Sequence, residues 1–161
     1  MPSEREIVHK FWKQLQSDRT VLLGVEGSGE AQPMTALLES DDERGPVWFF
    51  SSKDVDLVNE IGMGQPGVLY FTAKGHDLFA GVHGELSLVY DRGVIERLWN
   101  PFVAAWYEGG KDDPSLQLIR FDPAHAHIWL NENSVFSGVK ALLGRDPKQD
   151  YGGKTADVPL S

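Results

Sequence analysis

The 161-residue chain contains no cysteine. Disulfide bonds and thiolate metal sites are therefore excluded, and the composition is compatible with a reducing compartment. The first ten residues, MPSEREIVHK, are charged and lack the apolar segment of a signal peptide, and no apolar run reaches transmembrane length. We therefore expect a cytoplasmic protein that does not enter a membrane.

Basic residues are also scarce. The chain has 15 Lys and Arg against 24 Asp and Glu, which gives a net charge of −9. Nucleic acids and anionic membranes usually bind to a basic face, so we expect neither as a partner. A small anionic ligand held by a few local donors remains compatible with this composition. The length suits one domain with one core.

The common nucleophile and phosphate motifs are missing. There is no Gly-x-Ser-x-Gly elbow and no Walker loop. The GMGQPG segment, residues 62–67, has the glycine spacing of a dinucleotide fingerprint. It follows an expected helix and precedes an expected strand, which is the wrong order for that fold.

The candidate metal and carboxylate groups are weak. His125-x-His127 places two imidazoles on one face of a strand, but two ligands do not make a metal site, so we predict no metal. Asp112 and Asp113 precede Pro114, a pattern that is typical of a turn rather than of a catalytic carboxylate pair.

Local patterns predict many short strands and few helices. Ser3 and Glu6 form a capping-box pattern before an amphipathic helix that ends near Ser17. Pro33 favours an edge strand, and the glycines at 81 and 84 favour a bulge. Strands are expected at 20–26, 30–39, 47–52, 67–73, 78–90, 115–121 and 125–130, and further helices begin at Asp54 and at Asp91, the latter divided by Pro101.

Most of these strands follow one another through short turns. This order favours a mainly β fold, an antiparallel barrel with helices at its ends and sides, rather than a repeated βαβ sheet. Residues 1–145 are expected to form one domain. The polar segment 146–161, which is rich in Gly and Pro, is expected to be a mobile tail or an intersubunit contact.

Two segments could contribute to a ligand site. Ser51, Ser52 and Lys53 lead from a strand into the helix expected at Asp54, which could place hydroxyls and an ammonium at a phosphate, although a polar strand end before a helix is also ordinary. Trp99 and Trp106 are seven residues apart and would lie on one face of a helix. They could pack in the core or wall a planar ligand.

Four stretches together resemble a known family. They are QPMT at 32–35, VWFFSSKD at 47–54, GVHGELSLV at 81–89 and LWNPFVAAWYEGGKDDPSLQLIRFDP at 98–123. In this order, from Glu6 to Leu130, the chain resembles the FMN-binding split-barrel proteins related to pyridoxamine 5′-phosphate oxidase, and in particular the general stress protein 26 type. The last stretch is the most specific.

The resemblance implies a six-stranded antiparallel split barrel that forms a homodimer, with FMN, or alternatively FAD, at the subunit interface. It implies that the strand at 32–35 runs beside the flavin, that the strand at 49–51 follows the ring and ribityl chain, that Ser52 and Lys53 lie near the phosphate, and that Trp106 closes over the site. The implied cofactor-binding residues are Gln32, Pro33, Met34, Thr35, Phe49, Phe50, Ser51, Ser52, Lys53 and Trp106.

The chain departs from the family pattern at three positions. Gln32 stands where relatives usually have Arg, and Val55 and Leu57 stand where they tend to have Ser and Lys that contact the phosphate. Three functions are therefore open: a flavin-dependent oxidoreductase, a flavin-binding stress protein without turnover, or a barrel that has lost flavin and binds a small molecule or a protein. No catalytic residue is assigned, and Lys53 and His83 are only candidates for an acid or base. The substrate and electron donor are not defined.

Overall fold

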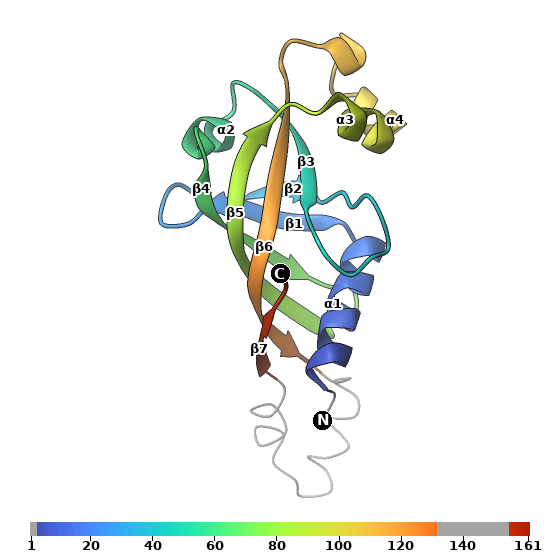
Figure 1. The fold of residues 1–161 in the computed structure, drawn as a ribbon, viewed down its shortest axis with the longest axis vertical. Helices are drawn as coiled ribbons and strands as arrows, with labels where there is room; N and C mark the ends of the chain where they lie inside the picture. The colour runs from blue at the N-terminus through green and yellow to red at the C-terminus, as the bar shows by residue number, and fades with distance from the viewer. Residues whose placement is uncertain (1–2, 132–154) are drawn as a thin grey trace, which may run out of the picture.

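A computed structural model describes residues 3–131 and 155–161 (Figure 1). The strands carry the fold, and the helices are short apart from the first. In chain order the elements are α1 (Glu4–Ser17), β1 (Thr20–Val25), β2 (Gln32–Thr35), β3 (Val47–Ser52), α2 (Asp56–Ile61), β4 (Gln65–Thr72), β5 (Leu78–Val89), α3 (Arg92–Leu98), α4 (Pro101–Ala104), the 3-10 turn η1 (Gly110–Asp112), β6 (Leu116–Leu130) and β7 (Thr155–Pro159).

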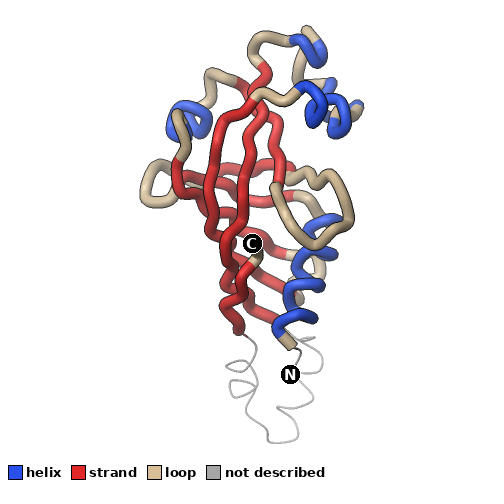
Figure 2. Tube along the Cα trace, viewed as in Figure 1, coloured by secondary structure: helices blue, strands red, loops and turns tan. Residues whose placement is uncertain are grey.

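The strands form one antiparallel sheet that curls around a core. Its order is β2-β1-β4-β5-β6-β3, and β7 pairs with β6. The strands occupy the middle of the molecule and the helices its periphery (Figure 2). β2 lies at one end of the order, so Pro33 is on an edge strand, as its missing N–H predicts. The expected mainly β split-barrel architecture is confirmed, with seven strands in place of six.

Helix α1 begins with the predicted capping box. The Ser3 hydroxyl accepts the Glu6 N–H, and the Glu6 carboxylate accepts the Ser3 N–H. One apolar stripe of the helix, which includes Phe11 and Trp12, is fully buried against the sheet. The ring of Phe11 meets that of Phe71 on β4 edge to face at 6.3 Å. These contacts fix α1 along one side of the barrel (Figure 1).

The predicted bulge lies where β5 and β6 cross the middle of the molecule. Their register shifts between His83 and Gly84, which leaves Ala124 of β6 without a direct partner. The sequence predicted two strands, at 115–121 and 125–130, but β6 is one strand of 15 residues. The bulge accommodates Pro123, which cannot donate to the ladder, so the strand bends instead of ending.

The C-terminal segment differs from its expectation. Thr155–Pro159 forms β7, which pairs with β6 of the same chain, and Val158 and Leu160 are buried. His127 of β6 also binds Asp157 of β7, with Nδ1 and Oδ1 2.5 Å apart. Residues 155–160 are thus part of the barrel because alternate side chains complete its core, whereas 146–154 lie outside the described residues.

Two helix predictions need correction. Asp54 does not cap α2, since the N-cap is Val55 and Asp56 is the first helical residue. Asp91 does cap α3, where its carboxylate accepts the Val94 N–H. Pro101 starts a separate helix, α4, as a proline at the first helical position does. Trp99 and Trp106 therefore do not share one helical face.

The buried side chains form two clusters on opposite sides of the sheet. The larger fills the barrel and includes α1, α2 and the inner faces of the strands. The smaller joins the outer faces of β3 and β6 to α3 and to Tyr107, and Trp48 and Ile95 lie in it. The second cluster holds the α3–α4 segment against the barrel, and this position decides the shape of the site described below.

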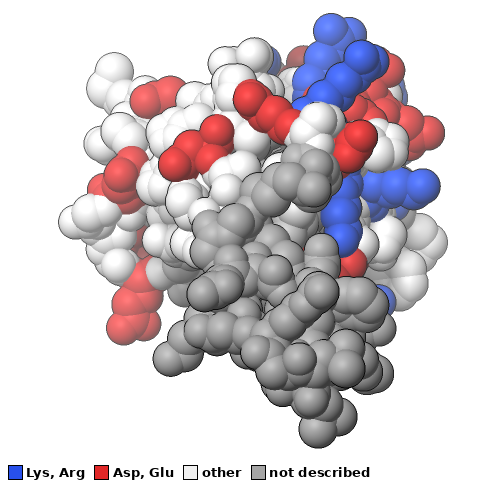
Figure 3. Space-filling model, turned by 90° about the horizontal axis from the view of Figure 1, so that it is seen from below, with Lys and Arg blue, Asp and Glu red and all other residues white. Residues whose placement is uncertain are grey.

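The charged side chains of one end of the molecule and the lengths of the helices complete the description of the fold. On the end seen in Figure 3, acidic and basic side chains both occur, with the basic ones gathered to one side. None of the helices in residues 3–131 and 155–161 is long and apolar enough to cross a bilayer.

The bulge predicts effects of different size for alanine substitutions at two nearby glycines of β5. A Cβ at Gly84 would collide with the carbonyl oxygen of Asp122 and lie 2.9 Å from the Pro123 Cα, whereas at Gly81 the nearest atom is a Tyr70 ring carbon at 3.6 Å. We expect Gly84→Ala to lower the free energy of unfolding by about 1–3 kcal/mol. Gly81→Ala should change it by about 0.5 kcal/mol or less. Urea unfolding measures both, and equal midpoints would contradict the bulge geometry.

Candidate functional site

The two ends of the strand order, β2 and β3, meet at an incomplete seam. Within the described residues, one bridge joins their margins: Leu37 and Trp48 exchange both backbone hydrogen bonds at 2.9 Å. Continuing this antiparallel register places Thr35 opposite Phe50 and Pro33 opposite Ser52. No ladder forms there, and the two facing strand edges are open.

This seam opens into a cavity of about 740 Å³, which we call the seam cavity. Its wall combines aromatic, aliphatic and hydroxyl groups with one guanidinium, and none of its lining residues is acidic or a histidine. Its volume is in the usual range of small-molecule sites. The lining residues are Arg19, Thr20, Pro33, Met34, Thr35, Leu37, Phe50, Ser51, Ser52, Val55, Asn100, Phe102, Val103, Trp106 and Tyr107.

Helix α4 supplies one wall of the seam cavity. The Asn100 side chain accepts the N–H groups of Phe102 and Val103 at 2.9 and 3.0 Å, which fixes the first turn. Phe102 and Trp106 are left on the rim, 86% and 84% exposed. Exposed aromatics at the mouth of a cavity provide flat apolar surface for a planar ligand.

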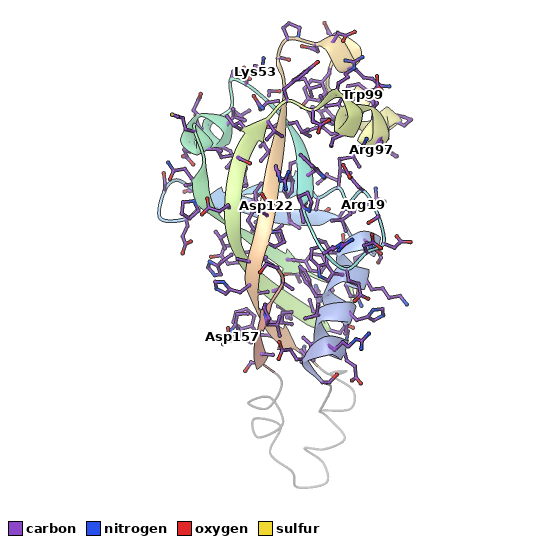
Figure 4. The ribbon with its side chains drawn as sticks, in the orientation of Figure 1. Arg19, Lys53, Arg97, Trp99, Asp122 and Asp157 are labelled. Atoms are coloured by element: carbon purple, nitrogen blue, oxygen red, sulfur yellow. The ribbon has the colours of Figure 1, made fainter. Side chains whose placement is uncertain are left out.

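Seven of the ten predicted cofactor residues line the seam cavity: Pro33, Met34, Thr35, Phe50, Ser51, Ser52 and Trp106. The other three do not. Phe49 points into the barrel core and is fully buried. Gln32 is half-buried on β2, where its amide approaches the Met34 sulfur at 3.9 Å. Lys53 lies beyond the end of β3 and lines a separate depression (Figure 4).

Eight lining residues were not among the implied cofactor contacts, although Val55 had been named as a departure from the family pattern: Arg19, Thr20, Leu37, Val55, Asn100, Phe102, Val103 and Tyr107. The Asn-Pro pair at 100 and 101 is a helix-start signal that could have placed α4. Arg19 carries no such signal, because it reaches the seam only through the pairing of β1 with β2.

The three departures from the family pattern occupy different environments. Val55 lines the seam cavity. Leu57 is buried in the barrel cluster with Val58 and Ile61 of the same helix. The Leu57 side chain therefore stabilises α2 against the core and does not face the cavity.

Neither acid–base candidate lies in the seam cavity. His83 stacks on His125 on the outer face of the sheet, with ring centroids 5.1 Å apart, and its Nδ1 is 3.7 Å from Glu26. Lys53 shares its depression with Lys111, Asp112 and Gln117. Among residues 3–131 and 155–161, no three His, Asp or Glu side chains come together as a metal site.

The ionisable groups that do line the seam cavity are Arg19 and Tyr107. Burial raises the pKa of the Tyr107 hydroxyl above its usual value, and a hydrogen bond with Ser52 opposes part of that shift. Tyr107 is therefore a neutral hydroxyl at physiological pH. The described wall of the cavity offers hydrogen bonds and one positive charge, but no group that titrates near neutrality.

Comparison with known proteins assigns the family. The family model described as pyridoxamine 5′-phosphate oxidase like matches residues 6–149. The chain belongs to this family. A general stress FMN/FAD binding protein from Xanthomonas citri is 54% identical, with a TM-score of 0.76 over 80% of this chain and 92% of that one.

Two further relatives define the range of the similarity. A structure named general stress protein 26, from Jannaschia sp. CCS1, is 30% identical with a TM-score of 0.83, and the match covers 98% of this chain and 99% of that one. Protein bli-3 of Neurospora crassa is 29% identical over 38% of this chain. The match spans only 33% of the length of bli-3.

The raised pKa of Tyr107 predicts a dependence of stability on alkaline pH. The folded state binds this proton more tightly than the unfolded state, so its contribution is complete below pH 10 and is lost as the pH rises through the folded pKa. We expect the Tm of the wild type to fall more steeply above pH 10 than that of Tyr107→Phe. A difference of 1 kcal/mol corresponds to about 2–4 °C in Tm.

The exposed Tyr90 gives the control, since Tyr90→Phe should reproduce the wild-type profile. Parallel wild-type and Tyr107→Phe profiles between pH 9 and 11 would contradict the assignment.

Proposed function

We propose that this chain is a flavin-binding general stress protein and that the seam cavity is its flavin site. The observation that carries the proposal is the cavity itself, because it is lined by flat apolar side chains and several hydroxyls and includes seven of the ten residues that the family resemblance implies as cofactor contacts. The Xanthomonas citri relative, 54% identical, is named as an FMN/FAD binding protein, which supports the same ligand class.

The residues present fit a flavin. Phe50 and Trp106 offer flat surfaces from two different elements, one on β3 and one just beyond α4. Thr35, Ser51 and Ser52 offer hydroxyls along the seam, and the open strand edges offer backbone donors and acceptors. FMN is the proposed form and FAD the alternative.

We propose oxidoreductase activity as the finer function. A bound flavin would supply the electron or hydride transfer, and the protein would bind it, orient it and set its electrostatics. The cavity wall has no side chain that titrates near neutrality, which agrees with chemistry carried by the cofactor. Anaerobic mixing of the flavin-loaded protein with NADH, NADPH or pyridoxamine 5′-phosphate tests turnover. Bleaching of the flavin absorption bands supports turnover, and no bleaching by any donor favours a binding protein without turnover.

A cytoplasmic location remains a prediction.

We also propose a homodimer. The outer sheet face, formed by β1, β4, β5 and β6, exposes Leu22, Tyr70 and Trp129. Leu22 pairs directly with Tyr70 across β1 and β4. Thr20, which lines the seam cavity, is two residues from Leu22 and on the same face of β1. The exposed apolar surface thus continues from the cavity rim, and a second copy laid on it would cover the site.

Flavin binding is tested by titrating the purified protein with FMN and recording tryptophan fluorescence. Trp106→Ala should weaken FMN binding about two- to twelvefold, which is the effect of losing about 0.5–1.5 kcal/mol of aromatic contact. Tyr90→Ala removes an equally exposed aromatic that does not line the seam cavity, so it should leave the affinity unchanged. A protein that ignores millimolar FMN and FAD would reject the proposed function.

The dimer prediction is tested by light scattering at micromolar concentration. Tyr70→Glu places a charge in the middle of the outer sheet face and should convert the dimer to a monomer. Met63→Glu changes a more exposed apolar residue, in the turn between α2 and β4, and should leave the dimer intact. A monomeric wild type, or equal dimerisation of both variants, would contradict this interface.

A further inference from the structure

Arg19 is the charged side chain of the seam cavity. The wall contains no lysine, histidine, aspartate or glutamate among its lining residues. The whole chain has a net charge of −9, so a ligand-facing surface with one positive charge and no negative one departs from the rest of the molecule. A cavity of this kind favours a ligand that carries negative charge.

Arg19 is held at one end of the seam by the backbone. Its carbonyl accepts the N–H of Ala36 at 2.7 Å, which continues the β1–β2 pairing in which Thr20 lies opposite Thr35. Two residues beyond Thr35, the Leu37–Trp48 bridge closes the seam. Arg19 therefore stands near the closed end, whereas Ser52 and Val55 line the other end. Figure 4 shows Arg19 well apart from Lys53, on a different part of the molecule.

The guanidinium of Arg19 keeps hydrogen-bond donors that no described residue accepts. Arg19 also lines a neighbouring depression that contains Glu39 and Asp41. Its Nε donates to the carbonyl oxygen of Gln16 at 3.4 Å, and no carboxylate oxygen of the described residues lies within 4.0 Å of the guanidinium. Other arginines are committed, since Arg97 pairs with Glu39 at 3.2 Å and Arg120 pairs with Asp122 at 3.0 Å. A planar guanidinium with free donors recognises phosphate or another delocalised anion through parallel hydrogen bonds.

From these observations, and resting on the proposed function, we propose that Arg19 binds the negatively charged part of the flavin in the seam cavity. Two groups of a flavin have this chemistry: the phosphate of FMN, and the pyrimidine edge of the ring when reduction leaves it anionic. The assignment moves the positive charge of the site from Lys53, which lies in another depression, to the closed end of the seam.

The test compares FMN with riboflavin, which has the same ring and no phosphate. Affinities are measured for the wild type, Arg19→Gln, Arg19→Lys and the control Arg97→Gln, whose side chain does not line the cavity. Arg19→Gln should weaken FMN about 10- to 100-fold, as expected for the loss of charge-assisted hydrogen bonds. Arg19→Lys should retain part of the affinity, and Arg97→Gln all of it.

The two ligands separate the two sources of charge. If Arg19 binds the phosphate, Arg19→Gln weakens FMN, leaves riboflavin unchanged and abolishes the preference between them. If Arg19 faces the ring, both ligands weaken alike and the reduction potential of the bound flavin becomes more negative, because the reduced anion loses its counter-charge.

Two negative outcomes are distinct. Wild-type affinities for both ligands and an unchanged potential in Arg19→Gln would overturn the inference and leave the proposed function standing. A wild-type protein that binds no flavin would overturn both. The Tm of Arg19→Gln is measured alongside; because the side chain is exposed, it should match the wild type.

Discussion

The pairing of β5 with β6 is the constraint on which the rest of the structure depends. The two strands stay in register from Leu78 opposite Leu130 to Val89 opposite Leu118, with one shift at the bulge. β5 uses its other edge for β4, and β6 uses its other edge twice, for β3 in its first half and for β7 in its second. Because β6 is shared in this way, β3 covers only part of the barrel wall, and beyond the Leu37–Trp48 bridge its other edge faces the seam. The seam cavity follows from that division.

Local signals in the sequence account for much of the fold. The capping pairs at Ser3 and Asp91, the helix start at Pro101 and the edge position of Pro33 all depend on neighbouring residues, and each is present in the structure. The last strand could not be predicted in this way. Residues 155–160 belong to a segment, 146–161, whose overall composition is polar with Gly and Pro, and their pairing with β6 depends on a partner far away in the sequence. Two strands were expected where β6 is continuous because the bulge at Pro123 depends on the close approach of Gly84 on β5 to Asp122 and Pro123 on β6, a contact between residues far apart in the sequence.

For the site too, residues in recognisable motifs could be predicted, whereas residues brought in by long-range contacts could not. Thr35, Phe50 and Ser52 were reached through the order of family motifs, and the structure brings them together along the seam. Neighbouring side chains of a strand face opposite sides of the sheet. Applied to β3, this alternation predicts that Phe49 and Phe50 cannot both line the cavity. Arg19 and Tyr107 enter the cavity from other elements, through the β1–β2 pairing and the α3–α4 segment. No sequence pattern around either residue predicts that it lines the seam cavity.

The open strand edges along the seam have a consequence for how recognition can change over time. A ligand lying there faces main-chain N–H and carbonyl groups of β2 and β3, and every residue type except proline provides the same donor and acceptor. Such contacts persist when side chains are replaced, so a side-chain exchange on these two strands leaves the main-chain contacts in place. Alanine substitutions along the seam would therefore underestimate the contribution of its main-chain groups to ligand binding. Proline, which deletes a donor while leaving the neighbouring side chains in place, is the substitution to which this kind of recognition is sensitive.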